Sequence, residues 1–275
     1  MLLRMGRQDR RFPLPQSDST EMNKVVAGMS GGITDAPDIE TSSDNYASRF
    51  CGEVGQYLLG VQERGLFALM GQPSGSSVID VGGGHAQLAP PMARAGYVVT
   101  VAGSDASCGL RLAQEQTDAP IDFVACDLKA MPFADGQFNV VTSVRLMAHI
   151  DDWQLLVSEL CRVAGEAVII DFPIYFSLNA LSLLAFPLKK HIEKNTRTYR
   201  TFFGREVRKA FAEHGFRQTR SWRQFVLPMA LHRAGRGSTL LQRVEELMRK
   251  AGLTRIFGNP VLVRFDRESS QQENA

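Results

Sequence analysis

The residues best suited to chemistry stand in the stretch SSVIDVGGGHAQLA, residues 76–89, where three glycines follow β-branched residues and an acid. Glycine lacks a Cβ, so Gly82, Gly83 and Gly84 can adopt positive φ and let a ligand approach the backbone closely. A helix that we expect to begin near Gln87 would favour a negative group at its N-terminus. We therefore expect a ligand-binding turn here; the alternative is a tight turn that binds nothing.

The surrounding sequence predicts the elements that position this turn. Short apolar runs, typical of strands, alternate with helical segments. Such alternation predicts an α/β fold with a parallel, doubly wound sheet, in which ligands bind beyond the carboxyl ends of the strands. Two later strand candidates around a helix predict an antiparallel edge. The expected strands lie at residues 77–81, 97–103, 121–125, 138–144, 166–172, 217–228 and 260–267, and the helices between them at 88–96, 109–116, 151–165, 204–216 and 238–253.

The glycine spacing separates two kinds of nucleotide site. A dinucleotide fingerprint reads GxGxxG, but Gln87 stands in its third glycine place, so an NAD-dependent oxidoreductase remains only an alternative. The stretch resembles instead the D-x-G-x-G-x-G motif of class I S-adenosylmethionine-dependent methyltransferases, with Asp80, Gly82 and Gly84 in place and Ala86 as the third glycine. The resemblance covers residues 46–263.

Within that family the chain is most similar to the small-molecule type, the type 11 methyltransferases of the ubiquinone and menaquinone biosynthesis group. The resemblance implies S-adenosyl-L-methionine as cofactor. It also implies a Rossmann-like, seven-stranded, mostly parallel sheet of order 3-2-1-4-5-7-6 with an antiparallel last strand. A helical lead-in over residues 46–71 and a substrate-covering lid after the fifth strand complete the expected fold.

The resemblance assigns two further acids to the cofactor. Asp105, with Ala106, would meet the ribose hydroxyls, although Gly103 holds the nominal place and Asp105 follows about two residues later. Asp127, with Leu128, would face the adenine amine, as an acceptor of a charge-assisted hydrogen bond. Taken alone, each acid could equally be a solvated loop residue or a helix cap.

The methionine end of the cofactor has its own expected residues. Ser143 and Arg145 end the fourth strand where the family lines that part of the site. Tyr46 and Arg49 resemble an N-terminal element that folds over the cofactor, and the planar guanidinium of arginine suits a carboxylate. A packed tyrosine and a plain surface arginine are the alternative.

His149 is the expected catalytic residue. It follows the fourth strand, and histidine titrates near neutrality, which suits a general base for an acceptor that must lose a proton. A structural histidine is the alternative. The expected acceptor is a small or lipid-like metabolite, with the oxygen, nitrogen or carbon acceptor atom left open. An RNA methyltransferase is a further alternative because the second half is basic, but we do not expect a nucleic-acid partner, since no aromatic platform for RNA is recognisable.

The chain has 275 residues and a net charge of +2. We expect a flexible arm at 1–44, a methyltransferase domain at 45–267 and a disordered tail at 268–275. The lid insert at 172–204 begins apolar and continues with basic residues, which predicts contact with an anionic acceptor group or a peripheral membrane contact. The alternative is a helix packed on the sheet, followed by a solvated basic helix. Its test residues are Lys189, Lys190 and Lys194.

The four cysteines, Cys51, Cys108, Cys126 and Cys161, form no CxxC pair. We expect no disulfide, no zinc or other metal, and a cytoplasmic protein. No uncharged apolar run approaches the roughly 18 residues of a membrane span.

Overall fold

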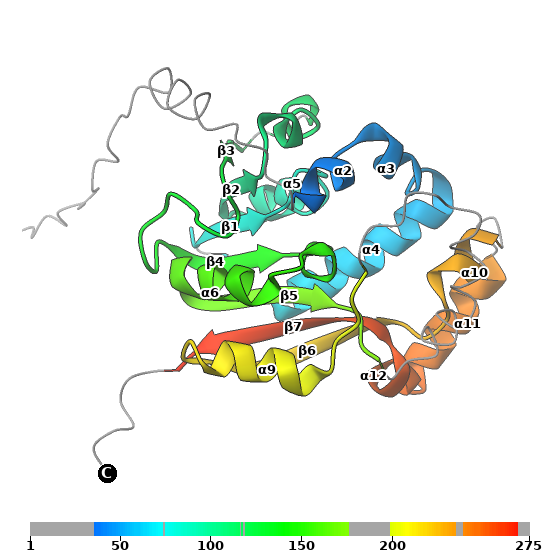
Figure 1. The fold of residues 1–275 in the computed structure, drawn as a ribbon. Helices are drawn as coiled ribbons and strands as arrows, with labels where there is room; N and C mark the ends of the chain where they lie inside the picture. The colour runs from blue at the N-terminus through cyan, green and yellow to red at the C-terminus, as the bar shows by residue number, and fades with distance from the viewer. Residues whose placement is uncertain are drawn as a thin grey trace, which may run out of the picture. The chain divides into compact units, whose positions relative to one another are not determined.

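A seven-stranded sheet of order β3-β2-β1-β4-β5-β7-β6 organises the chain (Figure 1). The computed structural model describes residues 36–73, 75–115, 117, 119–175, 199–234 and 239–268. Strands β1 to β5 pair in parallel, and β7 runs antiparallel to both β5 and β6. The expected fold class and strand order are confirmed. The strands are β1 Ser77–Val81, β2 Val98–Gly103, β3 Ile121–Ala125, β4 Phe138–Ser143, β5 Ala164–Phe172, β6 Phe216–Phe225 and β7 Asn259–Arg267.

Helices cover both faces of the sheet, which is why the central strands are mostly apolar. On one face α4 (Gly52–Leu69) and α5 (Ala89–Arg94) bury Leu66 and Met92 against Val78. On the other face α6 (Trp153–Val163) and α9 (Gly204–Ala212) bury Leu160 and Phe211. The two clusters hold the glycine turn, at the end of β1, between rigid layers.

The N-terminal part of the described chain differs from expectation. Helix α2 (Pro37–Thr41) and helix α3 (Asp44–Ser48) precede α4, and the expected helix over 46–71 is interrupted. The expected boundary of the arm at residue 44 is wrong, because Asp38 of α2 is completely buried. The proline and acids at the start of α2 are a helix-start signal, but five residues are too few to reveal an amphipathic pattern. The rest of the expected arm, residues 1–35, lies outside the described residues.

The segment after β2 also differs from the structure that the sequence predicts. A helix was expected at 109–116, but the structure has two short 3₁₀ turns, η1 (Ala106–Gly109) and η2 (Leu112–Gln114). Asp105 caps the first turn by accepting a hydrogen bond from the Ser107 backbone N–H at 2.8 Å. A Cβ at Gly109 would lie 2.8 Å from the Phe123 ring, so the chain turns close to β3 here.

Three helices lie beside the outer strand β6: α10 (Met229–Ala234), α11 (Thr239–Lys250) and α12 (Leu253–Phe257). Most of the expected lid, residues 176–198 with its three test lysines, lies outside the described residues, as does the tail beyond 268. The two described ends of the lid meet in a bridge between Ile174 and Phe202. No described helix is both long and apolar enough to cross a membrane.

Candidate cofactor site

The glycine turn after β1 requires its glycines. Gly82 has a φ of 76°, in the left-handed region that favours glycine. A Cβ at Gly83 would lie 2.1 Å from Asp80 Oδ2, and one at Gly84 would lie 2.3 Å from Ser42 Oγ and 2.4 Å from the Cys108 carbonyl oxygen. The turn therefore has no room for side chains at Gly83 and Gly84, because other protein atoms approach both positions closely.

Asp80 anchors this turn from inside the sheet. It pairs in register with Thr142 of β4, whose hydroxyl donates a hydrogen bond of 2.8 Å to Asp80 Oδ1. The carboxyl group is buried, and its desolvation raises its pKa to about 6. Asp80 is thus a buried acid at the base of the turn.

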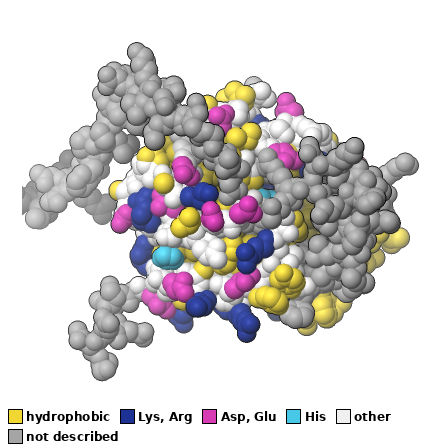
Figure 2. All heavy atoms as spheres, in the orientation of Figure 1, with side chains coloured by type: hydrophobic (Ala, Val, Ile, Leu, Met, Phe, Trp, Pro, Cys, Tyr) yellow, Lys and Arg dark blue, Asp and Glu magenta, His cyan; other side chains and the backbone are white. Residues whose placement is uncertain are grey.

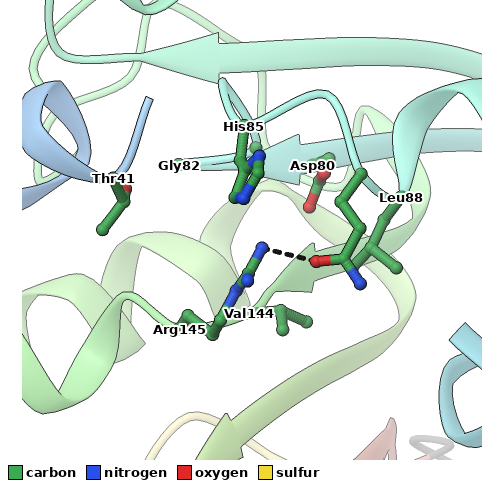
Figure 3. Close-up of a pocket in the computed structure, with 9 residues that line it drawn as sticks. Thr41, Asp80, Gly82, His85, Leu88, Val144 and Arg145 are labelled. Carbon is green, nitrogen blue, oxygen red and sulfur yellow. Dashed lines mark hydrogen bonds between the residues drawn. The ribbon is translucent and has the colours of Figure 1, made fainter. Parts of the chain in front are cut away.

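Arg145 reaches the turn from the end of β4 because its backbone is left-handed, with a φ of 62°. The buried carboxylate of Asp171 holds this conformation by accepting a hydrogen bond of 2.6 Å from the Arg145 backbone N–H. Burial raises the pKa of Asp171 to about 6. Figure 3 shows the Arg145 side chain pointing toward His85 and Asp80, with its guanidinium hydrogen-bonded to Gln87.

Aromatic rings from the lead-in enclose the same guanidinium. Arg145 lies 5.0 Å from the ring centre of Phe50 and 5.8 Å from that of Tyr46, within cation–π distance. The rings of Tyr46 and His85 meet edge to face at 5.6 Å. The structure therefore places Tyr46 at the turn. Arg49 is half-exposed, stacks over Tyr46 at 5.2 Å and pairs with Glu40 at 3.6 Å, so its charge is directed outward.

Helix α2 lies over the turn at the end of β2. The Asp38 carboxylate accepts hydrogen bonds from the backbone N–H and the hydroxyl of Ser104, and from Cys108 Sγ at 3.4 Å. Ser104 follows Gly103, the nominal place of the family acid. A carboxylate therefore does stand at this strand end, but Asp38 supplies it from another part of the chain.

The cavity that remains at the turn is small. Thr41, Gly82, His85 and Arg145 line it together with other residues, and its volume is about 10 Å³. That is the room for about one water molecule. Arg145 Nη1 is buried beside it, with no hydrogen-bond partner among the residues that the structure describes. The site is chemically suited to an acceptor group, and α2 closes it.

The two acids expected at the nucleoside end lie on neighbouring loops at the same edge of the sheet. Asp105 is exposed and caps η1, with Ala106 as the first residue of that turn. Hydrogen bonds from Ser107 lower the pKa of Asp105. Asp127 is exposed and accepts a hydrogen bond of 2.9 Å from the Lys129 backbone N–H, whereas Leu128 is buried in the core. Both acids stand free of the closed part of the site.

Ser143 and His149 have different surroundings. Ser143 is buried, and its hydroxyl donates a hydrogen bond of 3.1 Å to the Val81 carbonyl oxygen, so it ties β4 to β1. His149 is half-buried in the turn η3 (Met147–His149), with its ring 5.6 Å from that of Tyr199. It does not line the small cavity at the glycine turn.

Sequence reasoning missed several residues of this site. Asp38 and Thr41 belong to helix α2 and Ser42 caps it, within the segment that the sequence predicts as an arm, and Asp171 lies near the end of the apolar strand β5. An acid at the end of a buried strand, in the run EAVIIDF, was the signal for Asp171. Nothing in the sequence pointed to Asp38, because its partners lie 66 and 70 residues away.

Comparison with known proteins supports the Rossmann-like α/β fold described above. Residues 79–167 match the family model of a methyltransferase domain. The demethylmenaquinone methyltransferase of Renibacterium salmoninarum is 31% identical over 106 residues, which are 38% of this chain and 44% of that protein. The ubiquinone/menaquinone biosynthesis C-methyltransferase of Desulfotalea psychrophila is 28% identical over 147 residues, or 50% and 60% of the two chains.

The similarity of structure extends further than the similarity of sequence. The crystal structure of the magnesium protoporphyrin IX methyltransferase from Synechocystis superposes with a TM-score of 0.55 at 16% identity, over 91% of this chain and 95% of that one. The chain spans less than two thirds of the two curated relatives described above. Residues 79–167 are therefore similar to a methyltransferase domain, and the chain has the Rossmann-like fold of the methyltransferase structure with which it superposes.

Proposed function

We propose that this chain is an S-adenosylmethionine-dependent methyltransferase that acts on a small or lipid-like metabolite. The observation that carries the proposal is the glycine turn with Arg145 held beside it in a strained backbone conformation. Strained residues persist where the surrounding structure enforces them, and they cluster at functional sites. The matched domain and the curated relatives, which are named for quinone methylation, support the same activity.

The residues present fit the cofactor chemically. The buried, unpartnered Nη1 of Arg145 beside Gly82 and Gly83 suits the carboxylate of the methionine end. The exposed acids Asp105 and Asp127 suit the ribose hydroxyls and the adenine amine. A cavity of about 10 Å³ cannot hold a nucleoside, so binding requires α2 to move away from Gly84.

The cofactor's sulfonium supplies an activated methyl group, so the protein must mainly orient the acceptor and exclude water. Asp171 fixes the Arg145 backbone, and Tyr46 and Phe50 shield its guanidinium from solvent. Asp80 keeps the turn in place through Thr142. These residues hold a rigid floor against which an acceptor can be positioned.

His149 is proposed as the group that takes a proton from a hydroxyl or similar acceptor. It follows β4 at the carboxyl edge of the sheet, on the same edge as the glycine turn, and its ring is only half-buried. The acceptor class proposed is a ring-bearing, lipid-like molecule, because the two curated relatives described above are named for methylation in quinone biosynthesis. The insert at 172–204 is the proposed cover for that acceptor and the proposed point of membrane contact. A cytoplasmic location is proposed with it.

Calorimetry on the full chain tests the activity class. S-adenosylhomocysteine should bind, and NAD should not. Binding of NAD alone would establish the oxidoreductase alternative. Incubation of the enzyme and S-adenosylmethionine with an extract should then raise the mass of a small molecule by one methylene group, whereas methylation confined to RNA would establish the other alternative.

A further inference from the structure

A second, larger cavity lies at the other end of the sheet, between β6 and the helices α11 and α12. Its volume is about 520 Å³. In the sheet order β4, β5 and β7 separate β6 from β1, so this groove is not part of the site at the glycine turn. We call it the β6 groove. Its lining residues are Ser221, Trp222, Arg223, Arg249, Thr254 and Arg255.

The cations of the β6 groove outnumber the carboxylates that face them. Among the described acids, Glu246 is the one in ion-pair range of a groove arginine, and it lies 3.9 Å from Arg249 Nε. Arg223 donates instead to the Ile256 carbonyl oxygen at 2.9 Å. Arg255 is exposed and has no ion pair among the described residues. Within the described part of the chain, three guanidinium groups face one ion-paired carboxylate, which leaves an excess of two positive charges.

Arg223 shows what this excess of positive charge costs in free energy. Its guanidinium is partly buried, and the groups that satisfy it are backbone carbonyl oxygens. Burial lowers its pKa, with no carboxylate opposing that effect. A desolvated cation without a counter-charge costs free energy, which an anion in the groove would recover in part.

A further group that lines the groove lacks a partner. The Thr254 side chain is only 3% exposed, and its Oγ1 has no hydrogen-bond partner among the described residues. A hydroxyl can donate or accept, so Thr254 can serve a polar atom of a ligand in the groove. Trp222 Nε1 is also buried, but it lies against Gly65 of α4, where a Cβ would be 2.8 Å from it.

The geometry points to a phosphoryl-binding site: we propose that the β6 groove binds the phosphate of a phosphorylated small molecule or of a lipid headgroup. A phosphoryl dianion matches the excess charge, and guanidinium groups recognise its oxygens in bidentate fashion. Arg249 is preorganised for this role, because it stacks on the Trp222 ring at 5.2 Å and is tied to the Gln224 carbonyl oxygen.

The rim of the groove suits an apolar extension of the same ligand. Ile256 and Phe257, next to Arg255, are 62% and 42% exposed. Figure 2 shows hydrophobic side chains gathered at the lower right, where α12 lies in Figure 1. Apolar side chains beside cations are the pattern by which a protein surface meets an anionic lipid.

The test uses the full chain and three probes: inorganic phosphate, glycerol 3-phosphate, and phosphatidylcholine vesicles with or without phosphatidic acid. Arg255→Glu reverses one groove charge, and Thr254→Val removes only the unpartnered hydroxyl. Arg208→Glu is the matched control, since Arg208 is exposed on α9, which packs on the opposite face of the sheet. Thermal unfolding checks that each variant folds.

The natural chain should bind at least one phosphate-bearing probe, and Arg255→Glu and Thr254→Val should each weaken that binding about tenfold. Arg208→Glu should leave it within about twofold. Binding of the soluble probes identifies a free phosphorylated ligand, and binding confined to phosphatidic acid vesicles identifies a headgroup. No binding of any probe at about 10 mM phosphate groups, or equal losses in all three variants, would overturn the proposal.

Discussion

The glycine turn and the β6 groove differ in whether their arginines are matched by carboxylates and covered by other side chains. At the turn Arg145 lies among Asp171, Asp80 and Gln87, aromatic rings cover it, and a cavity of only about 10 Å³ remains. In the groove, which has a volume of about 520 Å³, three arginines face one carboxylate. The turn is preorganised and closed by the protein itself, so a ligand must displace helix α2. The groove is open, so an anionic ligand can supply the missing negative charge.

The difference has a structural origin. The turn stands where parallel strands end, and side chains from β1, β4 and β5 converge there with helix α2 above them. The groove stands beside an outer strand that pairs only with β7 within the sheet, and the helices α11 and α12 fill the free side incompletely. Central strand ends bring charges together, whereas an outer strand leaves them unmatched.

The largest expected effect is at Gly84. Gly84→Ala should abolish measurable binding of S-adenosylhomocysteine and lower the free energy of unfolding by about 1–3 kcal/mol, because its Cβ would overlap the Cys108 backbone oxygen. Gly60→Ala is the control, since a Cβ there would meet only Arg64 Nη1 at 3.5 Å. Calorimetry and thermal unfolding measure both. A Gly84→Ala protein that binds normally would show that the turn is no cradle.

The next effect concerns the proposed base. His149→Ala should reduce turnover by roughly 10²–10⁴-fold and leave S-adenosylhomocysteine affinity nearly unchanged, because the imidazole would act on the acceptor alone. His214→Ala, at an exposed histidine after α9, is the matched control. Turnover of His149→Ala within a fewfold of normal would make this histidine structural.

Buried acids at the turn predict a pH dependence. The pKa of Asp80 is raised from 3.8 to about 6, so the native state holds this proton more tightly than the unfolded chain does. Its contribution to stability is complete below about pH 4 and is lost as pH rises through 6, by about 3 kcal/mol. Asp80→Asn should remove this fall and be more stable than the natural chain at pH 7.5 by about 2 kcal/mol. Denaturant titrations between pH 4 and 8 would refute this if both proteins gave parallel curves.

Sequence was sufficient for the sheet and for the residues local to its strand ends. The sequence predicts the positions of Asp80, the glycines and Arg145 because Asp80 lies near the end of a strand and the others follow strands with clear apolar patterns. It does not predict that of Asp38, because a five-residue helix carries too little periodicity, and its hydrogen bonds to Ser104 form only after folding. The sequence does not predict the β6 groove either, because Arg223, Arg249 and Arg255 are far apart in sequence and are visible there only as part of a generally basic second half.

A smaller effect, with opposite signs for stability and binding, is expected at Asp38. Asp38→Asn weakens the hold of α2 on Ser104, so the free energy of unfolding should fall by about 1–2 kcal/mol. The same change should raise S-adenosylhomocysteine affinity by about threefold to tenfold, since a larger fraction of molecules would have the turn uncovered. Weaker binding would mean instead that Asp38 itself contacts the ligand.

The smallest expected effect tests whether the β6 groove and the glycine turn act independently. Arg255 is exposed and makes no ion pair within the described part of the chain, so Arg255→Ala removes no contact on which the fold depends. The free energy of unfolding and the S-adenosylhomocysteine affinity should both stay within about 0.5 kcal/mol of the natural values. Thermal unfolding and calorimetry on the same samples give both numbers. A loss of cofactor affinity without a loss of stability would couple the groove to the turn, and would end the view that an outer strand and the central strand ends act as independent sites.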